Sequence, residues 1–152
     1  MGRIDERLKE LGIALPAPRT PMANYVPAVR VGNLVYTAGQ VSAAAGREFK
    51  GKLGQDLDVE AGRQAARMCA INCLGALLSQ VDSLDRVKRI VRVGAFVQSA
   101  AGFDQQPAVA NGASDLLVEV FGEAGKHARA AVGVNELPLG FAVEIDLIAE
   151  VE

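Results

Sequence analysis

Two long segments of the chain place apolar residues at the spacing of a helix that packs one face against a core. Between Asp58 and Val81 these residues follow a 3.6-residue period, and Asp56 or Asp58 can cap the start. The positions are Ala61, Ala65, Met68, Ile71 or Asn72, Gly75 and Leu78. A second pattern runs from Phe103 to Phe121 and stops at Gly122. We expect two core helices that lie side by side.

Several other segments carry the period of two that is typical of strands. Residues 26–30 and 33–38 flank a glycine-containing turn and predict a hairpin. Residues 128–132 and 143–151 predict two further strands, the second with apolar residues on one face and Glu144 and Asp146 on the other. Residues 87–97 carry apolar side chains on both faces. A sheet face covered by another subunit would explain this last pattern.

The order of these elements predicts an α+β fold, a mixed sheet with two helices on one face. Residues 42–55 are polar and predict a loop with room for one short strand near Glu48 and Phe49. Upstream, residues 4–11 predict a short amphipathic helix ended by Gly12, and residues 15–21 predict a proline-rich extended lead-in. We therefore divide the chain into a lead-in at 1–23 and one domain at 24–152.

Composition narrows the class of protein. A chain of 152 residues is long enough for one real core, and with 50% hydrophobic but 5% aromatic residues that core is built from small aliphatic side chains. Small apolar side chains in excess of what the core needs are often buried in a subunit interface. A net charge of -2 gives no sign of the basic surface that binds nucleic acid, and no apolar run reaches the ~20 residues of a membrane span. A charged N-terminus favours a cytoplasmic protein over a secreted one.

The cysteines and the histidine do not form a recognisable metal or nucleophile motif. Cys69 and Cys73 lie four residues apart on one face of a predicted helix, a geometry that suits neither a disulfide nor a zinc site without nearby histidines. We interpret them as two small buried thiols. His127 is the only histidine, so no Ser-His-Asp or Cys-His set is evident, and no glycine-rich phosphate loop is present. We expect chemistry without a cofactor or metal.

The last quarter of the chain combines an arginine with an acid at the heads of two strands. The segment reads Ala128-Arg129-Ala130-Ala131-Val132, then Glu136-Leu137-Pro138, then Val143-Glu144-Ile145-Asp146. A guanidinium is a planar fork of donors that suits a carboxylate, and an acid nearby could handle a proton. This pairing predicts a small anionic substrate. The alternative for Arg129 is a structural salt bridge to Glu144 or Asp146.

This segment resembles the C-terminal signature of the RidA/YjgF family of reactive intermediate deaminases. Asn24-Tyr25 and the stretch from Val31 to Gln40, which ends in Thr37-Ala38-Gly39-Gln40, resemble the family's opening hairpin. The resemblance covers residues 24–152 and implies the chorismate-mutase-like fold. It also implies a homotrimer in which open sheet faces close around a central barrel, with active sites in the clefts between subunits.

The resemblance further implies roles for individual residues. Arg129 would hold the substrate carboxylate, Glu144 would position the attacking water or pass a proton to the departing amine, and the backbone carbonyl of Ala131 would serve the water site. Tyr25 and Gly39 would line the cleft. An exposed strand glutamate becomes a base only if burial raises its pKa. Tyr25 could equally be a packing residue.

Three positions depart from the family pattern or add to it. Where the family commonly has serine this chain has Ala38, so one hydroxyl is missing from the cleft wall. Where the family often has asparagine on the second helix the ungapped match places Ser114, with Asn111 one turn earlier, and either could replace it. His127 points to the same side of an extended chain as Arg129 and is a peripheral candidate, its alternative being a structural or solvated histidine.

These residues support three hypotheses. The leading one is hydrolysis of enamines or imines: a 2-imino acid, fixed by its carboxylate, becomes a 2-keto acid and ammonia. The second is a non-catalytic or regulatory trimer that binds a small carboxylate metabolite in the same clefts. The third is the ribonuclease or translation-inhibitor activity attached to family relatives, for which the chain offers no basic patch.

Overall fold

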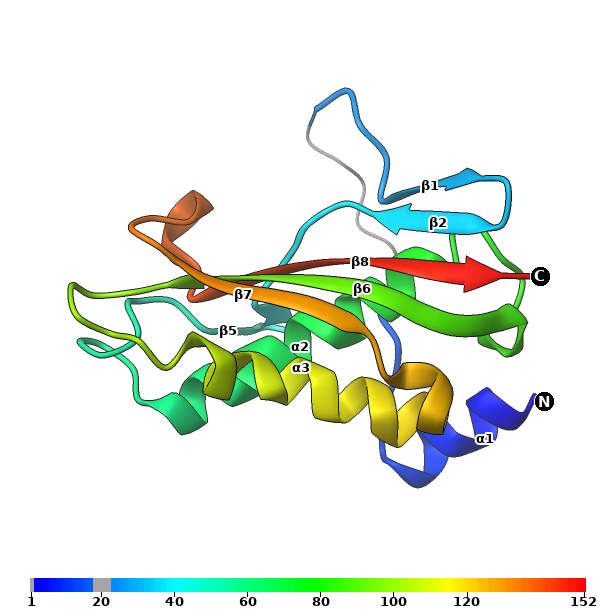
Figure 1. The fold of residues 1–152 in the computed structure, drawn as a ribbon, viewed down its shortest axis with the longest axis horizontal. Coiled ribbons are helices and arrows are strands. Elements are labelled where there is room, and N and C mark those ends of the chain that lie inside the picture. The colour runs from blue at the N-terminus through cyan, green and yellow to red at the C-terminus, as the bar shows by residue number, and fades with distance from the viewer. Residues whose placement is uncertain (1, 18–22) are drawn as a thin grey trace.

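A mixed sheet forms the centre of the molecule. The computed structural model describes residues 2–17 and 23–152, and in these residues a six-stranded sheet has the order β1-β2-β8-β6-β7, with β3 also paired to β8 (Figure 1). The strands are β1 (Ala28–Val31), β2 (Leu34–Thr37), β3 (Gln40–Val41), β6 (Val87–Gln98), β7 (Ala128–Val134) and β8 (Val143–Val151). Only β6 and β7 pair in parallel, and β1 and β7 form the two edges.

Two helices cover one face of this sheet and leave the other face open. These are α2 (Val59–Leu77) and α3 (Gln106–Phe121), which run side by side beneath the strands (Figure 1). Every second residue of β8, from Val143 to Val151, is buried against them. Asp58 caps α2 by accepting a hydrogen bond from the amide of Ala61 at 2.9 Å, and α3 ends at Gly122 with a positive φ of 64°. The predicted α+β architecture is confirmed.

A shorter N-terminal helix packs at the far end of α3. In α1 (Arg3–Glu10) the buried residues are Ile4 and Leu8, and the Arg7 side chain donates to the backbone carbonyl of Glu119 at 2.7 Å. This confirms the predicted short helix. Part of the predicted proline-rich lead-in, residues 18–21, lies outside the described residues. The division of the chain at residue 23 stays a prediction. Among the residues that are described, no helix is long and apolar enough to cross a membrane.

Three local predictions were wrong. Residues 42–55 contain the short strand expected near Glu48, β5 (Arg47–Glu48), but it pairs with a second strand, β4 (Ala43–Ala44), in a hairpin that was not expected. α2 ends at Leu77, four residues early, because the chain turns through residues 78–80. α3 begins at Gln106, three residues later than predicted.

The strand at 87–97 also departs from simple alternation. Two irregularities in its pairing with β8, at 87–89 and 90–92, shift the register, so that Ile90 and Val93 both face the core. From Val93 onward the alternation is regular: Val93, Ala95 and Val97 face the helices, while Gly94 and Phe96 lie on the open face. The bulges therefore set which residues reach each face.

The close approach of α2 and α3 depends on glycines at their contact, above all on Gly112. A Cβ built on Gly112 would collide with the backbone carbonyl oxygen of Arg63 in α2. Since that neighbour is backbone, neither helix can yield by a side-chain rotation. Gly112 thus fixes how deeply α3 sits against α2.

We predict that Gly112→Ala destabilises the protein by about 1–3 kcal/mol, the usual cost of overpacking. The sign is informative, because helix propensity alone would make the same change stabilising by about 1 kcal/mol. Chemical denaturation measures the free energy of unfolding. Glu119→Ala, an exposed position on the same helix, is the control and should change it by less than about 0.5 kcal/mol. A more stable Gly112→Ala variant would contradict the account.

Candidate active site

Arg129 lies near the start of the edge strand β7 and faces the helices. The parallel register places Arg129 opposite Val93, and Val93 is buried on the helix face of the sheet. Residues of paired strands that lie opposite each other point to the same face. The side chain of Arg129 therefore passes over the edge of the sheet towards α3.

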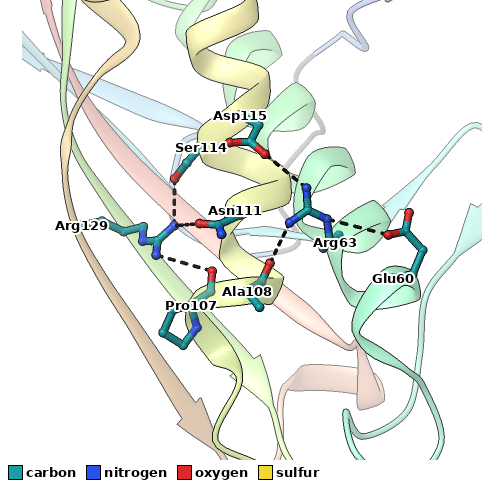
Figure 2. Close-up of polar contacts among 8 residues, drawn as sticks. All are labelled: Glu60, Arg63, Pro107, Ala108, Asn111, Ser114, Asp115 and Arg129. Carbon is teal, nitrogen blue, oxygen red and sulfur yellow. Dashed lines mark hydrogen bonds and ion pairs between the residues drawn. The ribbon is translucent and has the colours of Figure 1, made fainter.

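Three oxygen atoms of α3 hold the Arg129 guanidinium (Figure 2). Its Nη1 donates to Asn111 Oδ1 at 2.9 Å and to Ser114 Oγ at 3.1 Å, and its Nη2 donates to the Pro107 carbonyl at 3.5 Å. Residues 107, 111 and 114 are spaced by four and three, so they share one helix face. Both predicted replacements for the family's asparagine, Asn111 and Ser114, thus contact Arg129.

These contacts leave one side of the guanidinium available. Both Nη1 hydrogens and one Nη2 hydrogen point at α3, whereas Nε and the second Nη2 hydrogen have no hydrogen-bond partner among residues 2–17 and 23–152. These two remaining donors are the side-on pair that grips a carboxylate in two places. Within the same residues Arg129 makes no ion pair, so the alternative of a salt bridge to Glu144 or Asp146 is wrong for this chain.

His127 joins the same cluster through Ser114. Its Nε2 lies 2.9 Å from Ser114 Oγ, and its Nδ1 lies 2.6 Å from the carbonyl of Gly125 in η2 (Gly122–Gly125). Burial lowers the pKa of His127, with a contribution from the charge of Arg129, while the Gly125 carbonyl acts in the opposite direction. We call Arg129, Asn111, Ser114 and His127 the arginine cluster. Ser114 and His127 resemble a nucleophile and base, but a backbone carbonyl orients the imidazole where a triad has a carboxylate.

Glu144 lies elsewhere, on the open face of β8 beside Gly39. A Cβ on Gly39 would collide with the Glu144 carboxylate, so the glycine makes room for that side chain. Burial raises the pKa of Glu144, and the neighbouring charge of Asp146 raises it further. Burial also raises the pKa of Asp146, against the effects of Arg92 and of the Gly94 amide. We call Gly39, Glu144 and Asp146 the glutamate cluster.

One chain does not bring the two clusters together. Glu144 lies opposite Phe96 on the open face of the sheet, whereas Arg129 lies opposite Val93 on the helix face. Ala131, two residues after Arg129, shares its face and is half-buried. Tyr25, with 58% of its surface exposed, precedes β1 at the other edge, and Ala38 directly precedes Gly39. The predicted site residues thus form two separate groups.

Some members of these groups were not foreseen. The sequence placed Asp146 on the strand face of Glu144 but gave it only a salt-bridge role, although two carboxylates two positions apart on a strand must influence each other. The carbonyls of Pro107 and Gly125 carry no signal in the sequence, since any residue type supplies a backbone oxygen.

Cys69 and Cys73 are buried free thiols, as predicted, and burial raises the pKa of Cys73 to about 12. The thiol of each cysteine lies 3.4 Å from a carbonyl of β8. No group of three or more His, Cys, Asp or Glu side chains that could hold a metal ion occurs in the described part of the chain.

Comparison with known proteins places this chain in a family. A model of the YjgF/chorismate mutase-like endoribonuclease family matches residues 5–151, and the chain belongs to this family. Its observed mixed sheet with helices on one face is the fold of that family. The resemblance expected from the arginine and glutamate motifs is therefore confirmed.

Three similar proteins illustrate the range of the family. Protein TCP17 of Trypanosoma cruzi is 46% identical over 151 residues, which cover 98% of this chain and 94% of TCP17. A 2-iminobutanoate/2-iminopropanoate deaminase of Dermatophagoides farinae is 33% identical over 141 residues, which cover 92% of this chain and 95% of the deaminase. The crystal structure of Atu1372 from Agrobacterium tumefaciens, a protein of unknown function, matches with a TM-score of 0.91 at 43% identity. The match covers 98% of this chain and 92% of Atu1372. A distant relative is thus named as an imine deaminase.

The raised pKa of Glu144 predicts a pH-dependent effect of its removal. A carboxyl whose folded-state pKa is raised above its unfolded value, about 4.3, stabilises the fold when protonated and loses that contribution as pH rises through the folded pKa. Glu144→Gln should therefore gain melting temperature relative to wild type between pH 4 and pH 7. Thermal unfolding across this range measures it. Glu150→Gln, which removes a charge from the same strand, is the control. A difference in melting temperature between Glu144→Gln and wild type that stays constant with pH would contradict the raised pKa of Glu144.

Proposed function

We propose that this protein hydrolyses 2-imino acids to 2-keto acids and ammonia, without a cofactor, in clefts between the subunits of a homotrimer. The observation that carries the proposal is the state of Arg129. Three oxygens of α3 hold its guanidinium. Within the described residues no carboxylate pairs with it and its side-on donor pair is unused. Such a fixed, unpaired guanidinium suits a substrate carboxylate. The similarity to a named imine deaminase supports the same reaction.

The position of Glu144 supports a site made by two subunits. The two clusters lie on opposite faces of one sheet, so Arg129 of one chain meets a glutamate cluster most simply when a second copy packs against it. The open face is suited to such packing. It carries exposed or half-buried apolar side chains, namely Val29, Val31, Tyr36, Phe96, Val132 and Ile148. Apolar surface of this kind is typical of subunit interfaces.

The reaction needs only a water and a group that moves a proton. Arg129 holds the carboxylate, and the Glu144 carboxylate takes a proton from water as the water oxygen bonds to C2 of the imine. The electron pair of the C=N bond moves to nitrogen, which receives the proton from Glu144. Glu144 then takes the proton of the new hydroxyl group and passes it to the amine nitrogen, the C–N bond breaks with its electron pair going to nitrogen, ammonia leaves and the C–O bond becomes a carbonyl. A raised pKa brings Glu144 nearer to the pH at which it can both accept and return a proton.

Ala131 and Ala38 fit the same scheme in different ways. Ala131 would offer its backbone carbonyl to the water, a role that needs no particular side chain. Ala38 replaces a hydroxyl with a methyl group next to Gly39, which makes that wall of the cleft less polar. We infer that the site prefers imines with short aliphatic side chains. On the opposite wall, Ser114 keeps a hydroxyl in contact with Arg129.

A non-catalytic trimer that binds a small carboxylate would use the same guanidinium. The two functions differ in the glutamate cluster, since a binding protein has no need of a base with a raised pKa. Binding without turnover of any imine would favour this second function.

The rate of ammonia release from freshly generated 2-iminobutanoate, corrected for the buffer reaction, tests the proposal. Arg129→Ala should lower kcat/KM at least about 100-fold, because two charge-assisted hydrogen bonds of about 1.5–3 kcal/mol are lost. Glu144→Gln should lower kcat with less effect on KM.

Arg63 provides a matched control for Arg129. It grips the other side of α3, with Nη1 donating to the Ala108 carbonyl at 3.3 Å and Nη2 to Asp115 at 3.2 Å, and it pairs with Glu60 at 3.8 Å (Figure 2). Arg63→Ala removes an arginine from the same helix surface and should leave kcat/KM near that of wild type. Equal losses in the Arg63 and Arg129 variants would indicate damage to α3 and contradict the assigned role. No acceleration by wild type would reject the deaminase.

A further inference from the structure

A chain of three hydrogen bonds connects the guanidinium of Arg129 to the backbone of η2. It runs from Arg129 Nη1 to Ser114 Oγ at 3.1 Å, from Ser114 Oγ to His127 Nε2 at 2.9 Å, and from His127 Nδ1 to the Gly125 carbonyl at 2.6 Å. Its members come from β7, α3 and the segment between them. The chain of contacts therefore ties the strand, the helix and the turn together at one point.

The chemistry of its two ends fixes the direction of the two outer bonds. A guanidinium can only donate and a carbonyl can only accept. Arg129 therefore donates to the Ser114 oxygen, and His127 donates from Nδ1 to Gly125. In a neutral imidazole with its proton on Nδ1, Nε2 is unprotonated, and the middle bond is made by the Ser114 hydroxyl donating to it. This arrangement requires a neutral imidazole with its proton on Nδ1, and each donor in it has one acceptor.

We propose that His127 is a positioning residue, which fixes the Ser114 hydroxyl as an acceptor and thereby orients the Arg129 guanidinium for its carboxylate ligand. The identity of the ligand rests on the proposed function, whereas the hydrogen-bonded chain does not. Without the imidazole acceptor, the Ser114 hydroxyl can rotate and its lone pairs are no longer aimed at Nη1. The side-on pair of Arg129 would then lose its fixed direction.

The surroundings of His127 favour the neutral form that this chain of bonds needs. Arg129 on β7 is the charged group that lowers its pKa besides burial, α3 contributes the uncharged Ser114, and η2 contributes the Gly125 carbonyl. The adjacent Lys126 pairs with Glu123 at 2.8 Å. Protonation of His127 would make Nε2 a donor, so the middle bond would reverse and the Ser114 proton would have no acceptor in the chain of bonds.

Two substitutions of His127 test the roles of its two ring nitrogens separately. The amide of Asn reaches about as far as Nδ1, so His127→Asn can keep the bond to Gly125 and loses the acceptor for Ser114. The amide of Gln reaches about as far as Nε2, so His127→Gln can keep that acceptor. Ser114→Ala removes the link itself. If the role of His127 were only to tie down the turn at Gly125, Asn would be the better replacement.

The first test needs no ligand, because His127 is the only histidine of the chain. Long-range proton–nitrogen NMR correlation spectra of uniformly ¹⁵N-labelled protein therefore show a single imidazole. At pH 7 we expect the proton on Nδ1 and an unprotonated Nε2, and on acidification we expect charging only below the ~6.5 of a free imidazole. A proton on Nε2 at neutral pH would overturn the proposal.

The second test measures the binding of 2-oxobutanoate, a stable 2-keto acid, by calorimetry at pH 7.5. We expect His127→Asn and Ser114→Ala to weaken binding about tenfold, the effect of one hydrogen bond to a charged group, and His127→Gln to stay within about twofold of wild type. The double variant Ser114→Ala/His127→Asn should be no weaker than either single variant.

Arg129→Ala separates the two proposals. If it abolishes binding while His127→Asn binds as wild type does, the positioning role is overturned and the proposed function stands. If Arg129→Ala binds as tightly as wild type, the proposed function fails, and the tautomer in the ligand-free protein then decides the hydrogen-bonded chain. Equal weakening by His127→Asn and His127→Gln would also overturn the positioning role, because it would show that the acceptor at Nε2 does not matter.

Discussion

The close contact between α2 and α3 at Gly112 determines the rest of the site. It sets the depth of α3, and α3 supplies all three oxygens that hold Arg129. On its other side the same helix accepts hydrogen bonds from Arg63 (Figure 2). α3 is therefore held between an arginine from α2 and an arginine from β7. A shift of this helix would move all three acceptors of the guanidinium.

The fold separates the cation from the base. A sheet with helices on one face presents alternate residues to two different environments, and Arg129 and Glu144 fall on opposite sides. Each cluster is electrostatically incomplete. The guanidinium has no carboxylate partner among residues 2–17 and 23–152, and the glutamate carries a raised pKa beside a second acid. A second copy of the chain and an anionic substrate together would satisfy both.

The sequence predicted the fold well where a period was long and regular. The two core helices, the five longer strands and the alternation of β8 follow from apolar spacing, and the family motif located Arg129 and Glu144. Prediction from the sequence failed where strand register or backbone atoms determine the structure. The bulges of β6 and the β4–β5 hairpin have no periodic signal, and the carbonyls of Pro107 and Gly125 belong to residues of any type. The sequence predicts His127 only as a peripheral candidate, because a lone histidine in a loop is more often structural or solvated, and its contact with Ser114, 13 residues away, carries no sequence signal.

Mixing two inactive variants tests the two-subunit site most directly. Arg129→Ala keeps its glutamate cluster and Glu144→Gln keeps its arginine cluster, so mixed assemblies of the proposed homotrimer, formed by refolding the two variants together, should contain intact clefts. When equal amounts of the two variants assemble at random, roughly a quarter of the clefts contain both native residues. Imine hydrolysis should then recover to about that fraction of the wild-type rate. Mass spectrometry of the intact assemblies confirms the mixing. Mixed assemblies as inactive as the parent variants would contradict a cleft built from the opposite faces of two sheets.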